Sequence, residues 1–282
     1  MTAPTALSPS GSSLARLDGL TVLIGGGKMG GAMLEGWLRL GLNPARVIVV
    51  DPEPSELVSQ LAERGVRIHG DTAALGPAST IILAVKPQVA GAVLPELKNI
   101  AGPNTLLISV MAGKTLAFLQ NLPNAAVIRA MPNTPAAIGR GITVAVANSH
   151  TSPAQRDIAN RLLAAVGAVE WVEDEGLLDA VTAVSGSGPA YVFLLAESLA
   201  RAGEAAGLPA ALSAKLARFT ISGSGELLHQ SALDPAQLRA NVTSPAGTTA
   251  AALSVLMADE GLDRLMEQAV AAATRRSREL AG

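Results

Sequence analysis

The chain has 282 residues and a net charge of −2 at pH 7, and apolar residues make up 49% of it while aromatic residues make up 2%. The balanced charge gives no electrostatic reason to expect nucleic acid or an anionic membrane as a partner. The lack of cysteine in the sequence excludes disulfides, thiolate catalysis and cysteine-ligated metal. The three scattered histidines have no ligand spacing, so no metal site is predicted.

The predicted elements begin after an N-terminal tail, residues 1–18, which is rich in Ser, Pro, Thr and Ala and is expected to be disordered. The tail has no apolar stretch long enough for a signal peptide, and the chain has no continuous run of 18 apolar residues. We therefore expect a cytoplasmic protein without a membrane partner.

The first predicted strand leads into a glycine-rich turn, Gly25-Gly26-Gly27-Lys28-Met29-Gly30, followed by helical apolar spacing. This is the context in which the GxGxxG pattern binds a dinucleotide. Gly25 would make the tight turn, Gly27 would let backbone approach the pyrophosphate, and Gly30 would let the helix pack on the strand. The N–H groups that begin the helix would face the phosphates. A glycine-rich turn without a ligand is the alternative.

Asp51 closes the second predicted strand and lies 21 residues after Gly30. An acidic side chain at this place normally accepts hydrogen bonds from the adenosine ribose hydroxyls, and its charge would repel a 2′-phosphate. Asp51 therefore favours NADH over NADPH. A turn or N-cap role before Pro52 is the alternative, and the two roles can coexist.

Short aliphatic runs alternate with helical or turn segments through the first part of the chain, as in a doubly wound α/β sheet. We expect residues 19–173 to form this dinucleotide-binding domain, with helices over 56–64 and 154–166. The predicted strands are 21–25, 47–51, 80–85, 105–110, 126–130, 142–147 and 169–172.

Two further segments follow predicted strands, at the edge where open α/β sheets bind ligands. Lys86-Pro87 places a cation there, although a solvated lysine that ends a strand is an equal alternative. The segment 129–135 contains two prolines, with Asn133 and Thr134 as neutral hydrogen-bonding groups. Loop rigidity without ligand contact explains this segment equally well.

The pattern changes after residue 173, and residues 174–282 are expected to form an all-helical domain. Several of these helices are apolar over most of their circumference, as in 191–195. This pattern favours burial against a second subunit over burial within a monomer. The predicted helices are 176–184, 189–206, 209–229, 235–240, 246–258 and 260–280.

Two of these helices begin with small polar residues, Ser185-Gly186-Ser187-Gly188-Pro189 and Ser244-Pro245-Ala246-Gly247-Thr248-Thr249. Unsatisfied N–H groups at such helix starts suit a carboxylate, and the hydroxyls add hydrogen bonds without a fixed charge. Ordinary N-capping is the alternative for each segment taken separately.

Together these residues resemble the Δ1-pyrroline-5-carboxylate reductase family, and the resemblance runs from about residue 20 to the end of the chain. It implies a Rossmann domain, a helical dimerisation domain, and assembly as a dimer or as a ring of dimers such as a decamer. The segments that carry it are 24–30, 84–87, 109–113, 129–135, 184–191 and 244–249.

The resemblance implies reduction of the cyclic imine 1-pyrroline-5-carboxylate to L-proline by NADPH or NADH, the last step of proline biosynthesis. It gives Thr249 the catalytic position, with its hydroxyl near the imine nitrogen. Substrate would be bound by Glu175, Asn241, Ser244, Thr248 and Thr249. The cofactor would be bound by Gly25, Gly27, Lys28, Met29, Gly30, Asp51, Val85, Lys86, Pro87, Ala112 and Asn133.

Three positions depart from the family pattern. Lys28 replaces the usual neutral residue of the glycine turn, and Asp51 stands where many relatives have Ser or Thr beside the 2′-phosphate. Ala246 replaces the first glycine of a Ser-Pro-Gly-Gly pattern, a change that a helical φ would accommodate and a positive φ would not.

The alternatives are a related reductase of another imine or a hydroxyacid, and a non-catalytic regulator that senses the cofactor. Hydroxyacid enzymes of this architecture use a helix-borne lysine, whereas Lys215, the one lysine after residue 173, lies outside both carboxylate segments. Retention of Thr248 and Thr249 argues against a regulator that has lost its substrate site.

Overall fold

We describe the protein from a computed structural model, in which residues 13–120 and 125–281 are described. Their contacts divide the chain into two units: 13–186 with the last turns of the chain from 274, and 187–273. From the sequence, this division was predicted at residue 173. The division comes later because residues 175–186 pack on the sheet, with Leu178 buried beside Val144 and Val146.

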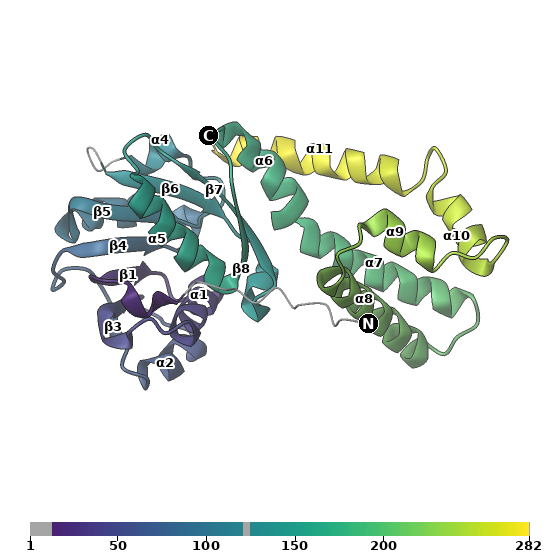
Figure 1. The fold of residues 1–282 in the computed structure, drawn as a ribbon, viewed down its shortest axis with the longest axis horizontal. Helices are drawn as coiled ribbons and strands as arrows, with labels where there is room; N and C mark the ends of the chain where they lie inside the picture. Colours follow the sequence, from purple (N-terminus) through teal and green to yellow (C-terminus); the bar gives the residue numbers. More distant parts are fainter. Residues whose placement is uncertain (1–12, 121–124, 282) are drawn as a thin grey trace. The chain divides into compact units, whose positions relative to one another are not determined.

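The first unit contains one eight-stranded sheet in the order β3-β2-β1-β4-β5-β6-β7-β8 (Figure 1). Neighbouring strands are parallel except for the antiparallel pair β6 and β7. The strands are β1 (Thr21–Ile24), β2 (Val47–Val50), β3 (Arg67–His69), β4 (Ala78–Leu83), β5 (Ala101–Ser109), β6 (Ala126–Met131), β7 (Gly141–Ala147) and β8 (Gly167–Trp171).

Helices cover both faces of this sheet, as the doubly wound prediction requires. Side chains along one strand alternate between two cores: in β1, Leu23 joins one core while Val22 and Ile24 join the other. The α-helices are α1 (Lys28–Arg39), α2 (Glu56–Ala62), α3 (Ala90–Glu96), α4 (Leu116–Leu119), α5 (Pro153–Leu163) and α6 (Leu178–Val181).

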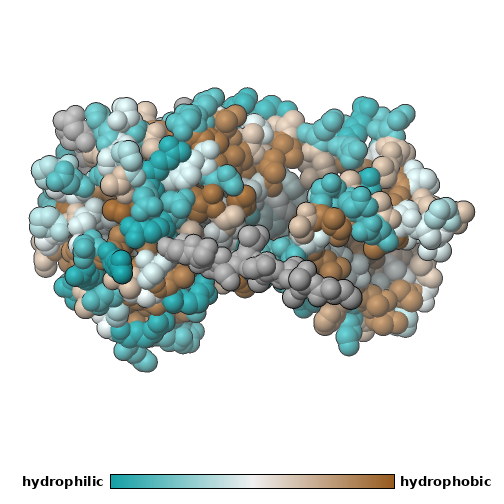
Figure 2. Space-filling model, in the orientation of Figure 1, coloured by the Kyte–Doolittle hydropathy of each residue, from teal (hydrophilic) through white to brown (hydrophobic). Residues whose placement is uncertain are grey.

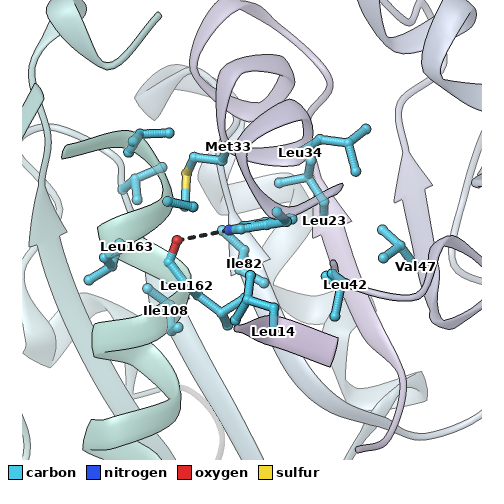
Figure 3. Close-up of a cluster of buried hydrophobic side chains, with 14 of the residues drawn as sticks. Leu14, Leu23, Met33, Leu34, Leu42, Val47, Ile82, Ile108, Leu162 and Leu163 are labelled. Atoms are coloured by element: carbon cyan, nitrogen blue, oxygen red, sulfur yellow. Dashed lines mark hydrogen bonds between the residues drawn. The ribbon is translucent and has the colours of Figure 1, made fainter. Parts of the chain in front are cut away.

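The larger core includes Trp37 of α1, which is fully buried together with strand residues such as Leu23 and α5 residues such as Leu162. Figure 3 shows Leu23, Ile82, Leu162 and Leu163 gathered in this core. The Trp37 indole Nε1–H donates a 2.8 Å hydrogen bond to the Leu162 carbonyl oxygen. A buried indole N–H needs such a partner, because leaving it unpaired would cost about 1–3 kcal/mol. The bond fixes α5 against the helix that follows the glycine turn.

The prediction that residues 1–18 form a disordered tail is wrong for residues 13–18, and residues 1–12 lie outside the described part of the chain. Leu14 and Leu17 are buried in the larger core, and the Leu14 N–H donates to the Leu40 carbonyl oxygen at 2.9 Å. Two apolar side chains spaced for one helical turn are sufficient to order this short segment, Leu14–Arg16.

The second unit is helical throughout its described residues. Its helices are α7 (Gly188–Ala205), α8 (Ala210–Gln230), α9 (Pro235–Asn241), α10 (Thr248–Leu256) and the greater part of α11 (Leu262–Ala281). Helices α7 and α8 pack closely, with the Ser213 hydroxyl donating to the Ala200 carbonyl oxygen at 2.6 Å. Large apolar side chains remain exposed on this chain, including Phe193, Leu194 and Phe219, and Figure 2 shows hydrophobic surface over these helices.

Candidate active site

The predicted cofactor residues of the first unit all follow strands whose carboxyl ends meet at one edge of the sheet. The strand order reverses between β1 and β4, and open α/β sheets bind ligands at such a switch point. The positions are Gly25–Gly30 after β1, Asp51 after β2, Val85–Pro87 after β4, Ala112 after β5 and Asn133 after β6.

The glycine turn is shaped by close backbone packing. Gly25 has φ +101°, a region that favours glycine, and a Cβ there would lie 2.7 Å from the Ala84 carbonyl oxygen. A Cβ at Gly30 would collide with the Gly25 carbonyl oxygen. These two glycines therefore let the β1 turn contact both the end of β4 and the first turn of α1.

Gly27 differs from both, because a Cβ built on it meets no atom within 4 Å and its φ of −70° suits any residue. It is the N-cap of α1, and no side chain caps this helix start. Open space beside uncapped N–H groups fits a pyrophosphate. Lys28 and Met29 begin the helix here, with Lys28 exposed and Met29 packed against the core.

Asp51 is held by backbone of the same edge. One carboxylate oxygen accepts from the Gly26 N–H at 2.6 Å, and the other accepts from the Glu53 N–H at 2.9 Å. The Ser55 hydroxyl donates to the Gly26 carbonyl oxygen at 2.6 Å. The β2–α2 loop therefore forms hydrogen bonds with both the N–H and the carbonyl group of Gly26. The turn role considered for Asp51 is thus present, and each oxygen keeps a lone pair for a ribose hydroxyl.

Ser55 was not among the predicted site residues. Its place before α2 indicates an N-cap serine, yet its side chain makes no capping bond and reaches across to the glycine turn instead. A sequence pattern shows only the local capping possibility, because Gly26 lies 29 residues away.

Lys86 is exposed and precedes a short 3₁₀ helix, Pro87–Val89, that opens with Pro87. Val85 and Pro87 are half-buried beside it. The position fits both interpretations, a cation for a bound ligand and a solvated lysine that ends a strand.

Ala112 is exposed in the loop between β5 and α4. Asn133 is the N-cap residue of the 3₁₀ helix Thr134–Ile138 but makes no side-chain capping bond, and its side-chain oxygen instead accepts from the Ile142 N–H at 3.0 Å. Asn133 therefore fixes the loop that follows β6.

Glu175, predicted to bind substrate, makes contacts within the first unit. Its Oε1 atom accepts from the Leu116 N–H at 2.8 Å and from the Arg129 guanidinium at 2.7 Å. Arg129 was not a predicted site residue, because its position in a strand does not reveal a partner 46 residues away.

The second unit holds the other predicted substrate residues around the start of α10. Gly247 is the N-cap, no side chain caps the helix, and Thr249 is half-buried in its first turn. Ser244 and Thr248 are exposed beside it, and Asn241 ends α9, where its side-chain oxygen accepts from Gln237 Nε2 at 2.9 Å. Side-chain capping therefore does not explain this helix start, which leaves its N–H groups free for a carboxylate.

Ala246 adopts φ +56°, so the helical φ that would have accommodated it is not present. Ser244 through Gly247 form a turn closed by the Gly247 N–H, which donates to the Ser244 carbonyl oxygen at 3.1 Å. A turn of this kind with proline second and a positive φ third is type II, in which the third position favours glycine. The departure from Ser-Pro-Gly-Gly therefore places alanine in a strained conformation.

The other small-residue segment was predicted as the start of a helix, and part of it belongs to a preceding helical turn. Thr182–Gly186 form a π-helical turn, and the Ser185 hydroxyl donates to the Val181 carbonyl oxygen at 3.0 Å. Helix α7 then begins at Gly188, and Ser187 makes no side-chain cap. Short π-helical turns are frequent at functional sites.

Comparison with known proteins places these features in a family. Residues 175–280 match the sequence family described as pyrroline-5-carboxylate reductase dimerisation. A pyrroline-5-carboxylate reductase of Pseudomonas aeruginosa is 39% identical over 92% of this chain and 95% of its own length. The chain belongs to the pyrroline-5-carboxylate reductase family. One of Synechocystis is 43% identical over 92% of this chain and 97% of its own length.

Solved structures agree with this assignment. A pyrroline-5-carboxylate reductase of Coxiella burnetii superposes with a TM-score of 0.85 at 33% identity, covering 94% of this chain and 99% of its own. A Plasmodium falciparum pyrroline carboxylate reductase with NADP bound gives 0.76 at 28% identity, covering 94% and 99%. Residues 21–113 also match the family described as NADP oxidoreductase coenzyme F420-dependent. The predicted two-domain fold and NAD(P)-dependent oxidoreductase class are thereby confirmed.

Residues 175–205 of this reductase form a helical stretch long and apolar enough to cross a membrane by length and composition alone. An 18-residue window within it is sufficiently apolar although it is not a continuous apolar run. The stretch lies inside the dimerisation match, and its exposed apolar side chains fit the predicted burial against a second subunit.

Proposed function

We propose that this protein reduces 1-pyrroline-5-carboxylate to L-proline with NAD(P)H. The observation that carries the proposal is membership of the reductase family along more than nine-tenths of the chain. The uncapped, open start of α1 supports a cofactor site there, and the uncapped start of α10 supports a site for the substrate carboxylate.

The cofactor would be held by the edge of the sheet. The α1 N–H groups and Gly27 would bind the pyrophosphate, and Asp51 the adenosine ribose. Lys28, Met29, Val85, Lys86, Pro87, Ala112 and Asn133 are proposed to line the remaining cofactor path. When bound, a reduced nicotinamide supplies the hydride that adds to the imine carbon, which is C2 of the pyrroline ring and becomes C5 of proline, while the imine nitrogen gains a proton.

The chain's own residues would bind and orient the imine. Ser244, Thr248 and the first N–H groups of α10 would hold the substrate carboxylate, because a helix start stabilises an anion without a fixed positive charge. Thr249 would donate a hydrogen bond or proton at the ring nitrogen, which makes the imine carbon more electrophilic. Asn241 and Glu175 are proposed to complete this environment.

We further propose that NADH is the preferred cofactor. The β2–α2 loop presents the carboxylates of Asp51, Glu53 and Glu56 and contains no lysine or arginine between residues 51 and 56. A 2′-phosphate would carry negative charge into this acidic surrounding, whereas a ribose hydroxyl would donate to Asp51.

The chain carries a dimerisation domain, and we propose a dimer that assembles further, with a decamer as the arrangement that the family resemblance implies. A cytoplasmic protein without nucleic-acid or membrane partners remains our proposal, supported by the near-neutral charge and by a dimerisation match over the apolar helices.

An assay of the purified protein tests the reaction. We expect 1-pyrroline-5-carboxylate to accelerate oxidation of NADH and NADPH, with an equivalent amount of proline formed. Failure to form proline with either cofactor, from a protein that is folded and assembled, would overturn the proposed reaction.

A further inference from the structure

A buried cation lies at the carboxyl edge of the sheet without a role in the proposed reaction. Arg129 belongs to β6, paired with Ser109 of β5 on one side and Val146 of β7 on the other. Its side chain is only 6% exposed, so its charge requires a partner nearby. Glu175 supplies that partner through a 2.7 Å contact between NH1 and Oε1.

The same oxygen of Glu175 holds a third segment. Oε1 accepts from the Leu116 N–H at 2.8 Å, and Leu116 is the first residue of α4. One carboxylate atom therefore joins β6, the start of α4 and the 3₁₀ helix Glu175–Leu177. The carboxylate is 28% exposed, and the buried guanidinium fixes where it can lie.

The hydrogen bond to Leu116 fixes one end of the loop between β5 and α4. The other end is fixed at Val110, whose N–H donates to the Leu83 carbonyl oxygen of β4 at 3.0 Å. Between these two anchors lies Ala112, which is exposed and which the proposed function places beside the cofactor.

The middle of this loop also lies against the last turns of α11, which belong to the same unit. Gly113 has φ +71°, and a Cβ there would lie 3.5 Å from the Leu280 carbonyl oxygen of α11. That helix end is bound to α6 by the Ser277 hydroxyl, which donates to Asp179 at 2.7 Å. The loop between β5 and α4 is therefore held by several fixed neighbours. The ion pair between Arg129 and Glu175 is the charged contact among them.

We propose that Arg129 is a positioning residue that acts through Glu175 to set the loop around Ala112 against the reacting end of the cofactor. The proposal rests on the proposed function for the identity of that cofactor. The Arg129 guanidinium contacts Glu175, and the proposed function gives Arg129 no contact with the reacting atoms. The proposed pyrophosphate site at Gly27 lies in a different loop, between β1 and α1. Loss of Arg129 should therefore disturb hydride transfer more than the overall affinity for the cofactor.

The test compares Arg129→Met, Glu175→Gln and the double variant, with cofactor Kd measured without substrate and kcat at saturating 1-pyrroline-5-carboxylate. We expect Arg129→Met to lower kcat about tenfold while Kd for NADH changes less than about threefold. Because Arg129 acts only through Glu175, the double variant should lose little beyond Glu175→Gln alone. Arg129→Lys should recover part of the rate, since it keeps the charge without the fixed guanidinium geometry.

Arg46→Met is the matched control. Arg46 pairs with Asp18 at the same 2.7 Å, but these side chains are 44% and 92% exposed, and the pair lies before β2, away from the carboxyl edge. We expect unchanged kcat in this variant.

An unchanged kcat in Arg129→Met would overturn the proposal, as would losses that multiply in the double variant. If Arg129→Met does not fold, the proposal is decided by Arg129→Lys, in which an unchanged kcat would overturn it. Wild-type protein that binds NADH yet forms no proline would refute the proposed function alone. In that case the exchange of Ala112 loop amides in NADH-bound protein decides the positioning role, with faster exchange expected in Arg129→Lys and unchanged exchange contradicting it.

Discussion

Asp51 accepts a 2.6 Å hydrogen bond from the N–H of Gly26. This bond joins the carboxylate proposed to determine cofactor preference to the glycine turn proposed to bind the pyrophosphate. The second oxygen of the carboxylate is fixed by the Glu53 N–H at 2.9 Å. A carboxylate with both oxygens oriented by backbone keeps its charge in one place at the end of β2. This would make Asp51 a defined electrostatic obstacle to a 2′-phosphate in the proposed cofactor site.

Replacing Asp51 by serine should therefore shift cofactor choice towards NADPH. The change removes a negative charge and introduces a hydroxyl oxygen that can accept from the Gly26 N–H, so we expect the NADPH-to-NADH ratio of kcat/KM to rise about tenfold. Glu53→Gln is the control, because it removes a charge from the same loop while preserving the Glu53 N–H bond to Asp51. Equal ratios in wild type and Asp51→Ser would refute the role of this carboxylate.

Gly27→Ala separates cofactor binding from folding. The added methyl meets no protein atom within 4 Å, so the free energy of unfolding should stay within about 1 kcal/mol of wild type. The same methyl would occupy space proposed for the pyrophosphate, and we expect Kd for NADH to rise at least about tenfold, measured by calorimetry. Gly76→Ala is matched to it, since Gly76 also has open space but lies outside the predicted site, before β4. An unaltered Kd for NADH in Gly27→Ala would contradict the proposed pyrophosphate site at Gly27.

Ala246→Gly should stabilise the protein. The left-handed conformation at φ +56° costs alanine about 1 kcal/mol, and the greater freedom of glycine in the unfolded chain offsets roughly half of this gain. We expect a net increase of about 0.5 kcal/mol, seen as a higher denaturant midpoint at fixed protein concentration. Ala252→Gly within α10 should act in the opposite direction, by about 0.5–1 kcal/mol. A loss of stability in Ala246→Gly equal to that of Ala252→Gly would show that the turn gains nothing from glycine.

Thr249→Ala tests the proposed catalytic hydroxyl. We expect kcat to fall about 10²-fold, the lower range for loss of a positioned proton donor, while Kd for NADH remains within about twofold. Thr243→Ala is the comparison, because the Thr243 hydroxyl donates to the Arg239 carbonyl oxygen at 2.7 Å and has no proposed part in the reaction. A parallel loss of cofactor affinity in Thr249→Ala would instead indicate that this threonine is structural.

The elements with strong local patterns were predictable from sequence. Strands β1 and β2 are continuous aliphatic runs, and α5 begins with a Ser152 capping box and a proline. Strand β3 was missed because Arg67-Ile68-His69 is short and polar, and it is a strand through its pairing with β2.

The contacts that define the site were less predictable than the motifs that supply its residues. The placement of glycines and helix starts follows from local chemistry, as at Gly25 and Gly247. Bonds such as those of Ser55 to Gly26 and Arg129 to Glu175 join residues 29 and 46 positions apart. No local pattern encodes those partners, because the sheet order brings them together.

The most direct test of the central claim follows the hydrogen itself. Wild-type protein would be supplied with NADH deuterated at the transferable C4 position and with 1-pyrroline-5-carboxylate, and the product would be analysed by mass spectrometry and NMR. The account predicts L-proline carrying one deuterium at C5. Proline without deuterium at C5, or oxidation of the labelled cofactor with no proline formed, would contradict it.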